Sequence, residues 1–502
     1  MNGTVVSLAP LDLAVVGLFG VAILALGFSA RLRENTLLQF LAAGRRLTLP
    51  VFVAGLVSTW YGGILGIGES VSYYGLGTWL LFGLPYYVFA FVYAFFLADR
   101  VREAPQLTIP ERLHRQFGAR VAVAGAILIF LLAVPSAHVL MLGVLVQSLS
   151  GWGLTLSVVV GAAIGTAFLY RGGLLADARV SLLAFVMMYV GFAAMFLWCL
   201  THYPVGETWH ALENKALLTF SGGASPLMVL SLFVVGAWTI VDPGFHQKVN
   251  SSESSAVSKK GVLVSIGFWA LFDLMSIGCG MYALALLKPM PENPLLIFPA
   301  LGQTVLPAGL KAVFLCGLMG TILAAMVAYT LVAGATLGKD IAGNLFPGRE
   351  DHELTAWSRW GVVAACGLAI VLALGLKSVV ALWYAWAGLI VGPLLAPVVM
   401  AYIPRLCRCG PRTILTSIVV SFALAFAWFA YCKSIGNEGF ELAIVRDASG
   451  TRFVLPSATP TRSEAADLEK AERLSIGTLL PGLVVSLLII GIGQARGRRP
   501  SP

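Results

Sequence analysis

The chain has 502 residues, of which 58% are hydrophobic and 11% are charged, and its mean hydropathy is +0.88. A water-soluble domain of this length could not bury so much apolar surface, whereas a lipid bilayer accommodates it. The composition therefore excludes a soluble enzyme or binding module and predicts an integral membrane protein. The net charge of +9 is interpreted as a topology signal rather than a nucleic-acid footprint, because most basic residues fall in loops on one side of the membrane.

Long apolar segments follow one another along the chain. Each has roughly 20 residues, the length that an α-helix needs to cross a bilayer. Backbone groups must pair within each segment where water is absent, so we expect an all-α polytopic membrane protein. The thirteen predicted spans lie near residues 11–30, 48–74, 76–98, 121–148, 153–170, 180–201, 226–246, 261–287, 311–337, 360–376, 379–403, 413–432 and 476–493.

The loops between these spans predict the orientation of the chain. Thirteen spans place alternate loops on opposite sides, and 23 of the 33 Lys and Arg residues then share one side. Basic loops stay in the cytoplasm, so the N-terminus is predicted outside and the C-terminus inside a multi-pass cell-membrane protein. The first span has no basic residue before it, which favours an uncleaved helix over a signal peptide.

Two predicted spans are interrupted, the second within its length and the seventh near its inner end. The second contains Ser-Thr-Trp-Tyr-Gly-Gly over residues 58–63, and the seventh contains Asp-Pro-Gly over residues 242–244. Interrupted helices in two halves of a chain are typical of inverted-repeat transporters, whose exposed backbone groups bind solute or ion; close helix packing is the alternative role for the glycines. The predicted substrate-binding residues are Thr59, Trp60, Tyr61, Gly62, Gly63, Glu69, Trp238 and Asp242.

Few ionisable residues lie within the predicted spans. No Lys or Arg is expected deep in a span, whereas Glu69 and Asp273 are, and such carboxyl groups face a cavity or a partner. Glu69 is predicted to contact substrate or a proton, with a water-exposed carboxylate in an outer vestibule as the alternative. Asp273 is predicted to be structural, paired with polar groups such as Ser276. His138, the only histidine in the middle of a span, is predicted to serve packing.

Four passages resemble the sodium:solute symporter family, which includes sodium-coupled sugar, proline and pantothenate carriers. Residues 40–63 begin with FLAAGR and end with STWYGG, similar to the family's FLAGR and ATWFGG. LTIPERLHRQFG over 107–118 is similar to LTIPDLLERRFG, and YRGGLLA over 170–176 to YTxxGGLxAV. YTLVAGATLGKDI over 329–341 is similar to YLLVASTLFVRDI. The resemblance covers about residues 35–405.

The resemblance implies five helices repeated upside down, over 48–201 and 226–403. A leading helix and cytoplasmic linker at 1–47 precede them, and two further spans at 404–502 flank an outer loop at about 433–475. That loop is polar and predicts a solvated loop or a small outer cap. The implied function is cation-coupled secondary active transport of a small polar organic solute. No nucleic-acid partner is expected.

The resemblance also implies a sodium site, from which this sequence departs. In the family two adjacent hydroxyl residues in the ninth span bind sodium, together with backbone carbonyls that we place near Ser58 and Tyr61. Here Ala324 and Ala325 occupy the hydroxyl positions, and methyl groups cannot ligate a cation that prefers oxygen. The sequence predicts no cofactor and leaves Na⁺ and H⁺ open as coupling ions.

Two alternatives to a sodium-coupled symporter follow from the alanines. One is a proton-coupled or facilitative carrier, and the other is a transporter-like sensor. An enzyme is not predicted, because the sequence contains no His/Asp metal cluster, nucleotide-binding loop or Gly-x-Ser-x-Gly motif.

Overall fold

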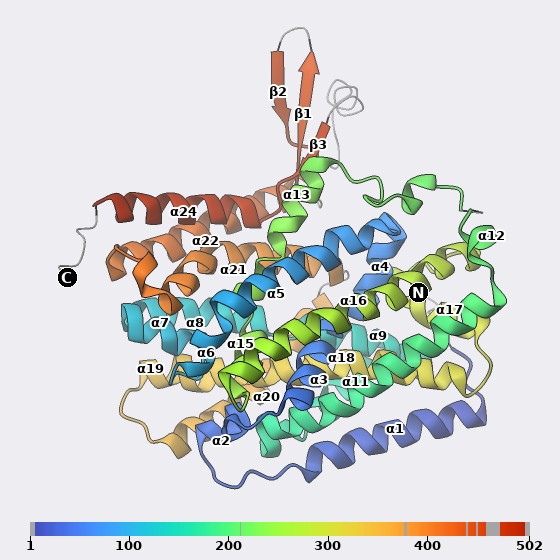
Figure 1. Cartoon of the computed structure of the whole chain (residues 1–502), viewed down its shortest axis with the longest axis horizontal. Coiled ribbons are helices and arrows are strands. Elements are labelled where there is room, and N and C mark those ends of the chain that lie inside the picture. Colours follow the sequence, from blue (N-terminus) through green and yellow to red (C-terminus); the bar gives the residue numbers. More distant parts are fainter. Residues whose placement is uncertain are drawn as a thin grey trace.

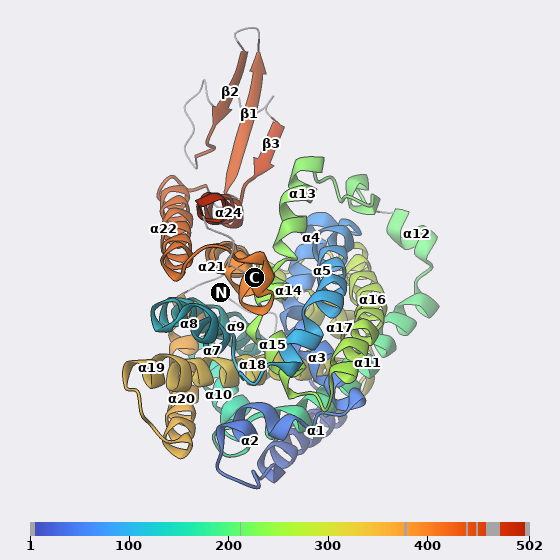
Figure 2. The same ribbon diagram turned by 60° about the vertical axis from the view of Figure 1, so that its left-hand side comes forward.

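The computed structural model describes residues 6–210, 212–375, 379–437, 440–447, 450–457 and 472–496. Most long helices run in one general direction, horizontal in Figure 1, and pack into a single bundle. Figure 2 shows α18 (Leu310–Ala335) in the interior, α1 (Pro10–Ser29) at one edge, and α22 (Pro411–Ser434) with α24 (Leu479–Arg496) at another.

The first part of the chain, up to residue 218, is helical apart from short connections. Its remaining elements are α2 Leu37–Ala42, η1 Ala43–Arg45, α3 Leu49–Trp60, η2 Tyr61–Gly63, α4 Ile64–Tyr74, η3 Trp79–Gly83, α5 Leu84–Phe96, α6 Ala98–Glu103, α7 Ile109–Phe117, α8 Ala119–Ala133, α9 Ser136–Ser150, α10 Leu154–Thr166, α11 Leu169–His202, α12 Val205–His210 and η4 Lys215–Leu218.

The second part is also mainly helical and ends with a small sheet before α24. Its remaining elements are α13 Pro226–Val235, α14 Trp238–Val241, α15 Pro243–Ser251, α16 Ser255–Leu286, η5 Pro294–Leu296, α17 Ile297–Val305, η6 Thr336–Ala342, α19 Gly343–Leu345, α20 Asp351–Gly375, α21 Val379–Tyr402, η7 Pro404–Leu406, β1 Glu441–Asp447, β2 Gly450–Val454 and β3 Glu472–Ser475.

The predicted polytopic helical fold is confirmed, but the count of thirteen spans is not. Within the described residues, ten helices are long and apolar enough to cross a membrane, and the helices over 228–251 form an eleventh candidate bent by 42°. The two other predicted spans coincide with α10, which has only 13 residues, and with α21, whose described apolar part is Gly388–Tyr402.

The polar stretch after α22 contains regular structure. β1 pairs antiparallel with β2 and β3, in the order β2-β1-β3. Of the two alternatives that the sequence left, a solvated loop and a small outer cap, the described part of residues 433–475 has the regular structure of a small cap. Ile444 and Val445 contribute to this, because β-branched residues favour strands.

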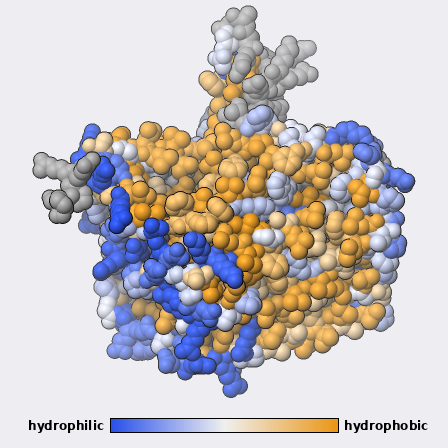
Figure 3. Space-filling model, viewed as in Figure 1, coloured by the Kyte–Doolittle hydropathy of each residue, from blue (hydrophilic) through white to orange (hydrophobic). Residues whose placement is uncertain are grey.

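The surface has the distribution that a bilayer requires. Figure 3 shows hydrophobic side chains across the middle of the visible face and hydrophilic ones gathered toward its left and right ends. In the most apolar window of each span, 89% of residues are buried for Leu310–Leu345 but only 22% for Pro10–Ser29. The helix over Leu310–Leu345, which contains α18, is therefore the core of the bundle, whereas α1 presents most of its surface to lipid.

Candidate substrate and ion sites

The first interrupted span tightens at η2 instead of unwinding. Tyr61 has φ −82° and ψ 10°, and Gly63 has φ −83° and ψ 19°. A Cβ atom added at Gly62 would lie 1.9 Å from the Ala325 Cβ atom and 2.9 Å from the His138 ring. Gly62 is therefore the contact at which η2 meets α18 and α9, so close packing explains this glycine.

The second interruption is built around Asp242. Its backbone is extended, as expected for the residue before a proline. One carboxylate oxygen accepts a hydrogen bond from the Phe245 N–H at 2.6 Å and caps α15. The other accepts from the Trp238 indole N–H at 3.0 Å and from the Tyr329 hydroxyl at 2.7 Å. Asp242 thus fixes the bend and ties it to α18.

A cavity lies between the two interruptions. It contains about 1430 Å³ of space free of protein atoms, including open solvent. Five predicted substrate-binding residues line it, whereas Gly62, Glu69 and Asp242 are not among its lining residues. The five are Thr59, Trp60, Tyr61, Gly63 and Trp238.

Aromatic side chains form much of the cavity wall. The Trp60 ring packs edge-on against Tyr86 at 4.9 Å and lies 5.3 Å from the Trp269 ring, measured between centroids. Trp238 and Tyr329 line the wall from α14 and α18. Such a wall offers flat apolar surface to a small organic molecule while a few polar groups orient it.

Asp273 provides a carboxylate at this cavity, whereas the sequence analysis expected a structural role in which it pairs with polar groups such as Ser276. It is 4% exposed and accepts hydrogen bonds from the Tyr61 hydroxyl at 2.8 Å and from the Tyr87 hydroxyl. The Ser276 hydroxyl contacts the Asp273 backbone carbonyl rather than the carboxylate. The only sign in the sequence that Asp273 belongs to a site was its position deep in a predicted span. Its tyrosine partners, about 190 to 210 positions away, could not be found from spacing.

Two further polar groups in the wall have no hydrogen-bond partner among the described residues. They are the His138 Nδ1 atom and the Thr59 hydroxyl, and both atoms are buried. The His138 ring stacks on Tyr329 with a centroid distance of 5.5 Å. His138 therefore packs as predicted but also presents a polar atom that packing leaves unsatisfied.

The predicted ion site has no side-chain hydroxyl from the alanine pair. Ala324 and Ala325 are fully buried, and the Ala325 methyl group faces η2 at Gly62. The Ser58 hydroxyl donates to the Ala54 carbonyl oxygen at 2.7 Å, within its own helix. Glu69 is buried on α4, away from the lining of the cavity.

One lysine lies deeper than expected. Lys248 was assigned to a loop, but α15 continues to Ser251 and buries the lysine side chain. Its ammonium group forms an ion pair with Asp177 on α11, and the Ser181 hydroxyl donates to the same carboxylate at 3.1 Å. Lys248 therefore lies near the end of the bent candidate span over 228–251 rather than in a loop, and its charge is balanced by a buried carboxylate, as such groups require.

An aromatic cavity between two interrupted helices, inside a bundle of membrane spans, defines a secondary transporter. The match of the family model described as "Sodium:solute symporter family" covers residues 40–410. The chain belongs to the sodium:solute symporter family.

Curated relatives include transporters of different solutes. The sodium/proline symporter of Haemophilus influenzae is 24% identical over 81% of this chain and 85% of its own length. The mouse sodium/myo-inositol cotransporter is 25% identical over 48% of this chain, and the match covers only 33% of the cotransporter. For zebrafish sodium/glucose cotransporter 4 the identity is 23%, over 72% of this chain and 62% of the relative.

Solved structures with the same fold are also transporters. A Na⁺-coupled sialic acid symporter, in a substrate-bound outward-open state, superposes with a TM-score of 0.76 at 12% identity and covers 97% of both chains. A nucleobase-cation-symport-1 family transporter has a TM-score of 0.54 at 14% identity, over 92% of this chain and 94% of its own.

Proposed function

We propose that the protein is a symporter that binds a small polar organic solute in the cavity between η2 and α14. One observation carries the proposal: aromatic side chains, one carboxylate and two polar atoms without a hydrogen-bond partner among the described residues line the same cavity between the two interrupted helices. The Thr59 hydroxyl, the His138 Nδ1 atom and the Asp273 carboxylate are the proposed polar contacts. Trp60 and Trp238 are the proposed apolar contacts.

We also propose weak coupling to sodium at the family's expected site. A sodium ion near Ser58 and Tyr61 would meet two methyl groups on α18 where the family has hydroxyl groups. A carboxyl group buried in a membrane protein can instead carry a proton through the transport cycle. Glu69, Asp242 and Asp273 are the acids close to the two interruptions, and proton coupling through one of them is the proposed alternative.

Uptake by proteoliposomes tests both parts of this proposal. We expect a panel of labelled amino acids, sugars and polyols to contain a substrate whose uptake depends only weakly on a sodium gradient but clearly on a pH gradient. The pH dependence should disappear in one of the variants Glu69→Gln, Asp242→Asn and Asp273→Asn, which identifies the acid that carries the proton.

The double variant Ala324→Ser/Ala325→Ser provides the matched gain-of-function experiment. Two added hydroxyl groups should raise the stimulation of uptake by sodium, because they supply missing oxygen ligands. Wild-type uptake that is steeply sodium-dependent and indifferent to pH would contradict the coupling proposal. Absence of uptake for every class of solute would favour the sensor alternative.

The proposed organisation places repeats at residues 48–201 and 226–403, with the N-terminus outside and the C-terminus in the cytoplasm. In a variant without native cysteines, a cysteine at exposed Ser7 should react with a membrane-impermeant maleimide added to intact cells. A cysteine at exposed Ala495 should react only after permeabilisation. Reaction of Ala495→Cys in intact cells, or protection of Ser7→Cys, would overturn this topology.

A further inference from the structure

A second, smaller cavity continues the line of the first. The same helices border both: α8 contributes Leu132 to the first cavity and Ile129 to the second, and α18 contributes Tyr329 to the first and Ala335 to the second. α14 has Trp238 at the first cavity, and α15, which follows it, has Pro243, His246 and Gln247 at the second. The second cavity also borders α7, at Ile109 and Pro110.

A hydrogen-bonded group of residues, which we call the Asp242 layer, connects the walls of the two cavities. Tyr329 and Trp238 line the first, and both donate hydrogen bonds to Asp242, which immediately precedes Pro243 in the wall of the second. Movement of this single hydrogen-bonded layer would join the two spaces.

The second cavity has polar atoms that the described protein does not satisfy. His246 and Gln247 are 3% and 8% exposed, and the His246 Nδ1 and Gln247 Oε1 atoms have no hydrogen-bond partner in the described residues. Buried polar groups normally have partners. These two atoms are suited to a polar molecule or water that passes through.

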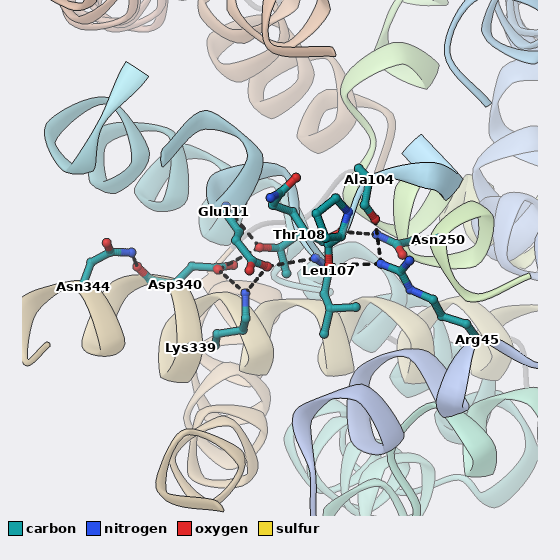
Figure 4. Close-up of polar contacts among 11 residues, drawn as sticks. Arg45, Ala104, Leu107, Thr108, Glu111, Asn250, Lys339, Asp340 and Asn344 are labelled. Carbon is teal, nitrogen blue, oxygen red and sulfur yellow. Dashed lines mark hydrogen bonds and ion pairs between the residues drawn. The ribbon is translucent and has the colours of Figure 1, made fainter. Parts of the chain in front are cut away.

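Beyond this cavity, a cluster of charged residues joins α7 to η6 (Figure 4). The Lys339 ammonium group lies 2.6 Å from the Glu111 carboxylate and 3.4 Å from that of Asp340. The Asp340 carboxylate accepts a hydrogen bond from the Thr108 hydroxyl at 2.8 Å. We call these four residues the charged latch. Because η6 is a π-helical segment, a feature often found at functional sites, it is a specialised end to α18.

The loop that precedes α7 is held from its other side as well. Arg45 donates to the carbonyl oxygen of Ala104 at 2.8 Å, and the Asn250 amide donates to that of Gln106 at 2.6 Å. The Glu111 carboxylate accepts from the Leu107 N–H at 2.8 Å, so the same carboxylate orders the loop and binds Lys339. Leu107 and Thr108 also line the second cavity, which places the latch directly at its boundary.

We propose that the second cavity is an exit chamber for polar solute and that the charged latch is the gate that closes it toward the cytoplasm. The inference rests on the proposed function and orientation, and it adds a second solute contact surface with named residues. The chamber would receive solute from the first cavity through the Asp242 layer. Opening would separate Lys339 and Asp340 from Glu111 and Thr108.

Cysteine accessibility tests the gate without knowledge of the solute. Ala335, which lines the chamber and is 3% exposed, is replaced by cysteine in a variant without native cysteines. A membrane-impermeant maleimide is applied to the cytoplasmic face of inside-out vesicles. With the latch intact we expect slow labelling. Lys339→Met should speed it about tenfold, the factor that corresponds to about 1.4 kcal/mol of lost closed-state stability.

Control variants separate gating from unfolding. Glu353→Gln breaks the exposed pair with Arg349, at 3.1 Å, and should leave labelling unchanged. A cysteine at fully buried Ala369 on α20 should stay unlabelled when Lys339→Met is present. Thr108→Val, which removes only one hydroxyl group, is the second test variant if Lys339→Met does not fold. It too should raise the labelling of Ala335→Cys.

Unchanged labelling in Lys339→Met, or in Thr108→Val where Lys339→Met does not fold, would overturn the gate, as would equal labelling of the Ala369 cysteine. Failure of the proposed function has a different signature. In that case the labelling still rises on opening the latch, but no labelled solute enters proteoliposomes.

Discussion

Gly62→Ala is expected to abolish solute uptake although the protein is still produced and inserted. The added methyl group would lie 1.9 Å from the Ala325 Cβ atom, far inside van der Waals contact, so η2 and α18 would have to separate. Overpacking of this kind costs about 1–3 kcal/mol even in cores that adjust. Gly62→Leu should have the same effect in a more severe form. Initial uptake rates normalised to surface expression provide the measurement.

The matched controls exploit the same contact. Gly267→Ala adds a methyl group on α16 where no atom lies within 4 Å, and it should transport normally. The double variant Gly62→Ala/Ala325→Gly exchanges the two residue types across the contact and should recover part of the lost uptake. Full activity of Gly62→Ala alone would show that the contact between η2 and α18 is not tight during transport.

Asp273→Asn should lower kcat/KM for uptake by about tenfold to a hundredfold. An amide can accept only through its oxygen atom. Tyr61 can donate instead to the Trp269 carbonyl oxygen at 2.8 Å, so the Tyr87 hydroxyl group is the one that would lose its acceptor inside a buried wall. An unsatisfied buried polar group costs about 1–3 kcal/mol, and each 1.4 kcal/mol is a factor of ten. Proteoliposome uptake over a range of solute concentrations measures the effect.

A double variant shows whether the loss of uptake in Asp273→Asn arises from the unpaired Tyr87 hydroxyl group. Tyr87→Phe removes the donor that Asp273→Asn would leave unpaired, so the pair of changes together should cost little more than Asp273→Asn alone. Strictly additive losses would mean that Asp273 acts on the solute independently of Tyr87. Uptake by Asp273→Asn equal to wild type would remove Asp273 from the proposed site.

The residues of the candidate site that the sequence analysis predicted lie near the two interruptions. Asp-Pro at 242–243 alters backbone conformation locally, and a local rule therefore predicted that break. The glycines at 62–63 marked the position of η2, but Gly62 serves close packing there. The membrane class followed from length and hydropathy alone. The number of spans was predicted less well. An apolar stretch of the length of residues 153–170 can be a single membrane-spanning helix or a shorter helix followed by a turn, as α10 is, and apolar length alone does not distinguish the two.

The remaining contacts depend on which helices become neighbours. Asp273 was recognised as buried, but its tyrosine partners lie on η2 and α5, far away in sequence. Lys248 fell outside the predicted span over 226–246, whereas α15 continues to Ser251 and Asp177 of α11 neutralises the lysine. The charged latch likewise joins residues more than 220 positions apart.

α18 reaches from Tyr329 at the first cavity to η6, where Lys339 lies ten residues further on, about 15 Å along a helix. One continuous helical segment, which we call the rod, thus contributes Tyr329 to the wall of the solute site and Lys339 and Asp340 to the proposed gate. Thermodynamic linkage is reciprocal, so a solute that favours one tilt of the rod would bias the state of the latch, and a broken latch would in turn alter solute affinity. On this arrangement, a mutation at the latch is measurable as a change in solute binding at a cavity about 15 Å away along the same helix.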